Sequence, residues 1–144
     1  MAFTSTTFTR YVFVALIGLS LAAQSRETFK ARLSATPADA RTRAELAGIG
    51  SVSAVLDGSK LAITGSFEGL RSAATGANLH SGVAAGVRGP AIADLTVSKA
   101  TSGTIAGSMA LTPEQIASLH KGGFYVLIQN EKAPDGVLWG WLLK

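Results

Sequence analysis

Apolar and polar residues alternate along much of the chain from residue 28 onward, and this period of two is typical of half-buried β-strands. The segment TFKARLSA shows it most clearly, because every second residue from Phe29 onward is apolar. Residues 48–56 and 60–70 are predicted to form a hairpin, since the Asp57-Gly58 step between them supplies the positive φ that a tight turn needs. Further strands are expected at 91–100, 103–111, 124–130 and 137–144.

One segment, LTPEQIASLHKGG, carries the signals of a short helix near the C-terminal part of the chain. Thr112 is placed to cap the first turn, Pro113 fits the first helical position, and Gln115 can complete a capping box. Gly122 or Gly123 is expected to end the helix. His120 then falls in the last turn, where a partly protonated imidazole interacts favourably with the helix dipole.

These elements predict an all-β fold: an antiparallel β-sandwich with one short helix. The chain has 144 residues, of which 47% are hydrophobic, so it can bury the core of one domain. We assign that domain to residues 24–144.

The first 23 residues have a different pattern. A polar start ends at Arg10, an apolar run covers residues 11–21, and small residues follow at Ala22 and Ala23. This order predicts a signal peptide that is cleaved after one of these alanines, or else a hydrophobic helix that is retained as an uncleaved membrane anchor. Either alternative places the domain outside the cytoplasm, in the periplasm or secreted, with membrane attachment if the segment stays.

Composition and charge exclude several classes of function. The 13 basic and 9 acidic residues are scattered rather than clustered, so we expect no nucleic-acid partner. The absence of cysteine excludes disulfides and thiolate chemistry. The chain also lacks a G-x-S-x-G nucleophile motif and a phosphate-binding loop, and we therefore predict no catalytic residue and no cofactor.

The stretch GANLHSGVAAGVRGP, residues 76–90, holds one of the two histidines, His80. A metal site usually needs three or four ligands, and His80 has no obvious partners in the sequence, so it is only a weak metal candidate. The glycines more readily explain tight turns and close backbone approach. The residues that we single out in this stretch are Asn78, His80, Gly82, Gly86, Gly89 and Pro90.

The order of these segments resembles that of the CHRD domain, a module found in chordin and in bacterial secreted proteins. The likeness covers residues 28–143 and includes FKARLSA, the segment Ala77–Gly82 with the later Gly89-Pro90, and LTPEQIASLHKGGFYVLIQN. The family motif carries a histidine where this chain has Asn78, and another where it has Gln129. The resemblance implies an immunoglobulin-like β-sandwich outside the cytoplasm, and it implies no reaction.

The last strand departs from the family pattern, which alternates charged or polar residues with apolar ones. Alternation places Leu138 and Leu142 on one face, the inward face of the family. Val137, Trp139, Trp141 and Leu143 share the other face. If that face is outward here, it is a docking surface for a partner protein or a bilayer; the alternative is that loops or the helix cover the tryptophans as core.

These observations lead to a functional prediction: a non-catalytic exported module that acts by protein–protein or membrane-surface contact, as an accessory subunit docked on a larger envelope or membrane complex. One alternative is a free periplasmic or secreted binding or adhesive module. The second alternative is a metal-binding enzyme that uses His80.

Overall fold

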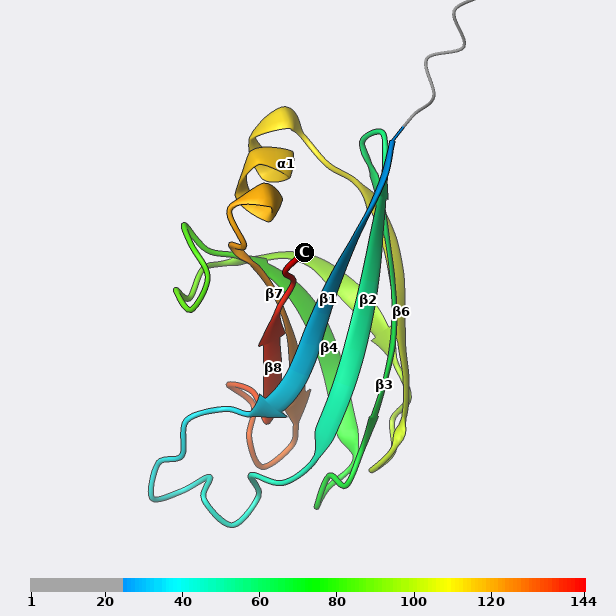
Figure 1. Ribbon diagram of the computed structural model, residues 1–144. Coiled ribbons are helices and arrows are strands. Elements are labelled where there is room, and N and C mark those ends of the chain that lie inside the picture. Colours follow the sequence, from blue (N-terminus) through cyan, green and yellow to red (C-terminus); the bar gives the residue numbers. More distant parts are fainter. Residues whose placement is uncertain (1–24) are drawn as a thin grey trace, which may run out of the picture.

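Eight antiparallel strands and one short helix make up residues 25–144, the part of the chain that the computed structural model describes (Figure 1). In chain order they are β1 (Arg26–Ala35), β2 (Ile49–Asp57), β3 (Lys60–Glu68), β4 (Ala74–Ser81), β5 (Ala91–Val97), β6 (Gly103–Ala110), α1 (Pro113–His120), β7 (Phe124–Asn130) and β8 (Leu138–Trp141). The predicted alternation is confirmed in β1, where Phe29, Ala31 and Leu33 are buried and their neighbours are more exposed. The predicted hairpin is β2–β3, with Gly58 at a φ of +63° in its turn.

The strands follow the order β1-β2-β3-β6-β5-β4-β7-β8 and close into a ring, because β1 pairs with β8 as well as with β2. The antiparallel all-β sandwich is confirmed, and the structure adds a feature that the sequence did not predict: the sheets are joined at both edges. At one edge β1 is shared, and at the other β5 pairs with both β4 and β6. The ten-residue β1 is long enough to reach both neighbours, and closure satisfies backbone groups that an open edge would leave unpaired.

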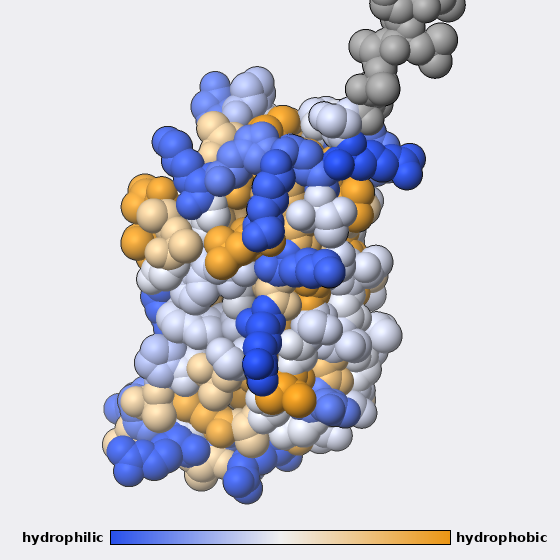
Figure 2. Space-filling view, viewed as in Figure 1, coloured by the Kyte–Doolittle hydropathy of each residue, from blue (hydrophilic) through white to orange (hydrophobic). Residues whose placement is uncertain are grey.

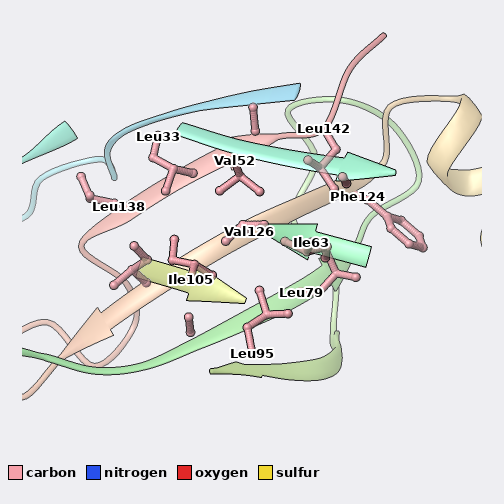
Figure 3. Close-up of a cluster of buried hydrophobic side chains, with 14 of the residues drawn as sticks. Leu33, Val52, Ile63, Leu79, Leu95, Ile105, Phe124, Val126, Leu138 and Leu142 are labelled. Carbon is pink, nitrogen blue, oxygen red and sulfur yellow. The ribbon is translucent and has the colours of Figure 1, made fainter. Parts of the chain in front are cut away.

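Hydrophobic side chains, most of them aliphatic, fill the interior of the ring (Figure 3). All eight strands or their immediate ends contribute, and none of the labelled side chains is more than 7% exposed. The labelled residues are Leu33, Val52, Ile63, Leu79, Leu95, Ile105, Phe124, Val126, Leu138 and Leu142. This core agrees with the inward positions that the strand alternation predicts.

Helix α1 covers one end of the ring (Figure 1). Its predicted capping box is confirmed: the Gln115 backbone N–H donates to the Thr112 hydroxyl at 3.2 Å, and the Thr112 N–H donates to the Gln115 side-chain oxygen at 2.9 Å. The last turn has a partner that the sequence did not indicate. His120 Nε2 lies 2.6 Å from a carboxylate oxygen of Glu27 on β1, and Glu27 also pairs with Lys144.

The predicted signal or anchor segment, residues 1–23, lies outside the described residues. Within residues 25–144, no helix combines the length and the apolar character needed to span a membrane.

We expect Leu79→Ala to lower the free energy of unfolding by about 2–5 kcal/mol, because Leu79 is fully buried and its truncation leaves a cavity. Urea denaturation measures this loss. The control is Ile49→Ala, whose side chain is 53% exposed and whose effect should stay within about 0.5 kcal/mol. Equal effects of the two substitutions would contradict this assignment of the core.

A second prediction concerns Glu27, which links β1 to α1 and to the C-terminus. Hydrogen bonds from Lys144 and then from His120 hold the pKa of Glu27 below its ordinary value. A carboxylate with a lowered folded-state pKa stabilises the fold above its unfolded pKa, and this contribution disappears as the pH falls through the folded value. Thermal melts should therefore show a small stabilisation at neutral pH that is lost below about pH 4.

Glu27→Gln should lower the melting temperature slightly at neutral pH and should match the wild type in acid, because the charge is absent in both proteins there. A constant difference between the two proteins at every pH would show that the ion pairs of Glu27 do not contribute.

Candidate functional site

Aromatic side chains gather on the outside of the ring, where β4, β7 and β8 lie side by side. Tyr125 on β7 pairs with His80 on β4 and with Trp141 on β8, and Trp139 pairs with Leu127 two residues further along β7. The register therefore brings His80, Tyr125, Trp139 and Trp141 to one outer face. We call these four residues the outer aromatic cluster.

The rings of the outer aromatic cluster are in direct contact. The His80 and Tyr125 rings stack at 4.7 Å between centroids, and Tyr125 and Trp141 lie 4.9 Å apart. The two tryptophan rings meet edge-on at 4.7 Å. Tyr125, which is 2% exposed, forms the centre, and the tryptophans around it are half-buried. Trp139 and Trp141 are thus outside the core, yet each is covered on one side by the cluster.

The other two residues of the predicted docking face differ from each other. Leu143 is 48% exposed, next to the cluster. Val137, in contrast, is fully buried, and its expected place on an exposed face is wrong. Val137 lies before β8, where its N–H donates to the Ile128 carbonyl and its own carbonyl accepts from the Thr36 N–H. The loop that follows β1 covers this end of the strand, so strict alternation does not extend back to Val137.

The stretch that holds His80 is only partly a loop. Residues up to Ser81 belong to β4, and the connection to β5 is residues 82–90. Gly89 is required there, because a Cβ at this position would lie 1.9 Å from the Ser81 carbonyl oxygen. The Ser81 N–H in turn donates to the Pro90 carbonyl at 3.0 Å, so the two ends of the loop are held together. Gly86, near its tip, has a φ of +81°.

The base of this loop is bound to the outer aromatic cluster by hydrogen bonds. The Gly89 N–H donates to the Tyr125 hydroxyl at 3.1 Å, and that hydroxyl donates to the Gly89 carbonyl at 3.0 Å. His80 Nδ1 lies 2.9 Å from the same carbonyl, which can only accept, so Nδ1 carries the proton. In the neutral ring Nε2 is then an acceptor, and it is buried with no hydrogen-bond partner among the described residues.

The loop also contributes a cation to the cluster. The Arg88 guanidinium carbon lies 4.5 Å from the Trp139 ring centroid, within the range of a cation–π interaction. Arg88 and Tyr125 were not singled out in the sequence. For Tyr125 a signal exists, because alternation along β7 places it on the face opposite Val126; for Arg88 the sequence offers none.

The three positions at which the family resemblance implies histidines lie on β4 and β7. His80 alone keeps the imidazole. Asn78 donates a hydrogen bond from its side-chain amide to Asp94 at 2.6 Å, and Gln129 pairs across the strands with Gly76. Within residues 25–144, no group of three or more His, Cys, Asp or Glu side chains is placed to hold a metal ion.

A polar pocket of about 460 Å³ adjoins the cluster. It offers the Arg88 guanidinium and the carboxylates of Asp39 and Asp135. Hydrogen bonds from the backbone N–H groups of Thr42 and Arg41 hold the pKa of Asp39 below its ordinary value, so this carboxylate is ionised at neutral pH. The pocket is lined by Thr36, Pro37, Asp39, Thr42, His80, Arg88, Gly89, Tyr125, Leu127, Gln129, Pro134, Asp135 and Gly136.

The polar atoms of the cluster hold the base of the loop, because the Tyr125 hydroxyl and His80 Nδ1 both contact Gly89. The aromatic rings beside them lie next to the Arg88 cation.

One protein-family model matches nearly the whole described chain. The family model of the CHRD domain matches residues 29–142. No curated protein and no solved structure matches the chain significantly.

Tyr125→Phe should loosen the loop, because it removes the hydroxyl that binds both backbone groups of Gly89. We expect the free energy of unfolding to fall by about 1–3 kcal/mol, because the part-buried Gly89 N–H loses its partner while the Gly89 carbonyl keeps His80 Nδ1. Amide hydrogen exchange of residues 82–90 should accelerate. Ser108→Ala, which deletes an exposed hydroxyl on β6, is the control. Unchanged exchange in the loop would contradict the anchoring role of Tyr125.

Proposed function

The chain belongs to the CHRD domain family, and from this premise we propose that the protein is a non-catalytic binding module that acts through the outer aromatic cluster. The observation that carries this proposal is the position of the two tryptophans of the chain, both of which lie outside the ring and half-buried. Aliphatic residues and three phenylalanines fill the core without them. Tryptophan that the core does not need is typical of binding hot spots.

The cluster is organised before any partner arrives. Tyr125 stacks on His80 and donates a hydrogen bond to Gly89, so its ring is fixed in position. The two tryptophan rings pack against this fixed ring. A rigid surface loses little side-chain entropy on binding, and this favours affinity. Two buried nitrogens of the cluster, His80 Nε2 and Trp141 Nε1, have no hydrogen-bond partner among the described residues. Each can therefore still form a hydrogen bond.

We infer that the partner belongs to a larger envelope or membrane complex, on which this protein is an accessory subunit outside the cytoplasm. The signal-like or anchor-like pattern of residues 1–23 supports export, and the contact surface supports docking. The competing assignment is a free periplasmic or secreted module, which would be isolated alone and as a monomer. A native mass spectrum of the protein purified in mild detergent from its own cells distinguishes the two.

We expect the wild type in that spectrum within a larger assembly, and the double variant Trp139→Ala/Trp141→Ala alone. Loss of two hot spots, at about 2 kcal/mol or more each, should weaken binding far more than tenfold. The variant should still unfold cooperatively, since neither tryptophan lies in the core. Ile49→Ala, at an exposed apolar position elsewhere, should stay in the assembly.

Two results would contradict the proposal. A wild-type protein that is isolated alone has no stable partner. A double variant that is unfolded shows that the tryptophans serve the fold.

A further inference from the structure

The tip of the loop 82–90 is apolar and exposed. Val83 is 79% and Val87 43% exposed, and only alanine and glycine lie between them. The loop projects from the strands beside β7 and β8, and hydrophobic residues are visible on it at the left of the molecule (Figures 1 and 2). A protruding apolar tip of this kind is costly in water unless something covers it.

Leu143 extends this apolar surface from the loop to the outer aromatic cluster. A Cβ at Gly122 would lie 2.8 Å from Leu143 Cδ2 and 3.4 Å from the Ala85 Cβ, so the loop tip and Leu143 flank the same glycine. Among residues 25–144, four large hydrophobic residues are exposed, and three of them, Val83, Val87 and Leu143, gather in this region. The fourth, Ile49, begins β2 and is not part of it.

Basic side chains border the same surface. Lys30 pairs with Leu143 through an isolated bridge, and Ser34 pairs with Trp139, so Arg32, between them on β1, faces outward beside Trp141. Figure 2 shows hydrophilic residues next to hydrophobic ones on this side of the molecule. Lys121 directly precedes Gly122, and Arg88 lies in the loop just before Gly89.

These four cations, Lys30, Arg32, Arg88 and Lys121, are exposed, and none forms an ion pair with a carboxylate within residues 25–144. The surface thus combines an apolar tip, two tryptophans and a border of uncompensated positive charge. Its chemistry is complementary to that of an anionic surface that also accepts apolar groups.

We propose that this surface, formed by loop residues 83–87, Leu143, the outer aromatic cluster and the four cations, binds the surface of an anionic phospholipid bilayer. This inference rests on the proposed function and names the partner of the same face. Valine side chains on the projecting tip enter the boundary between headgroups and acyl chains, as apolar side chains at an interface do. The tryptophans take the interfacial position that their rings favour, and the cations contact anionic headgroups.

The projecting loop suits contact with a bilayer, which a subunit docked on a membrane complex would lie beside. Val83 has the largest exposed fraction of the large hydrophobic residues in 25–144 and lies on a loop that projects from the strands (Figure 1), whereas protein hot spots cluster in well-packed pockets that exclude water. A bilayer deforms around a projecting loop and needs no matching groove. The small apolar side chains of the loop match the acyl chains of a bilayer, and the basic residues at its border match the anionic headgroups.

The test uses the full chain, exported and processed by a bacterial host, and follows its tryptophan fluorescence. Because both tryptophans of the chain belong to the cluster, this signal reports on the proposed surface alone. The probes are vesicles of brominated phosphatidylcholine, either pure or with one third phosphatidylglycerol. We expect strong quenching by the anionic vesicles, weak quenching by the neutral ones, and loss of the difference in high salt, where the screening length falls to about 3 Å.

Two pairs of substitutions separate the apolar and the charged contributions. Val83→Asp/Val87→Asp should abolish quenching, and Lys30→Glu/Arg32→Glu should weaken vesicle binding by about fivefold or more for each cation lost. The matched controls are Ile49→Asp and Lys60→Glu/Lys99→Glu, which alter exposed residues elsewhere and should bind as the wild type does. All these positions are exposed, and thermal melts verify that each variant is folded.

The outcomes distinguish this inference from the proposed function. If the vesicles cause no quenching, the bilayer proposal is overturned. If the double tryptophan variant is nevertheless lost from the assembly in the native mass spectrum, the partner of this surface is a protein. Quenching that is equal on both vesicles and insensitive to the substitutions would overturn it too, because neither the valines nor the cations would then determine attachment. Failure of both tests would remove the binding surface altogether.

Discussion

The pairing of β1 with strands on both of its sides is the constraint on which the rest of the structure depends. It joins the two sheets at one edge and closes the ring, so the interior is sealed by backbone hydrogen bonds as well as by packing. It also fixes the orientation of β8. With Leu138 and Leu142 directed into the core, Trp139 and Trp141 must face outward, and the outer aromatic cluster follows from the same register that closes the fold.

Local patterns in the sequence predicted seven of the eight strands, the helix and its capping box, because these depend on neighbours within a few residues; β4, inside a glycine-rich stretch, was not predicted. Alternation also predicted that Leu138 and Leu142 share one face of β8 and the tryptophans the other, while the family resemblance implied that the leucines face inward. Closure of the ring was not, since it depends on the meeting of the first and last strands, which are separated by about a hundred residues in the chain and carry no local signal for each other. Val137 was misplaced for a similar reason: the segment that covers it comes from Thr36, at the far end of the sequence.

The site shows the same division. His80 and the tryptophans stand out in the sequence as residue types, and the family resemblance adds the positions of Asn78 and Gln129. What the sequence did not reveal is that Tyr125 connects them. Its contacts with His80 and with Gly89 join residues 45 and 36 positions apart, and they exist only because β4 and β7 are neighbours in the ring.

Loop 82–90 combines order and exposure in a way that bears on function. At its base, the backbone of Gly89 is held by a buried tyrosine, while at its tip Val83 has almost no cover. Exposing valine in water is unfavourable, so apolar side chains in this loop favour contact with a surface that covers them. The base of the loop is bound to Tyr125, and Arg88 lies over the Trp139 ring. The register of β4, β7 and β8 therefore places the exposed valines and the two tryptophans on the same side of the ring.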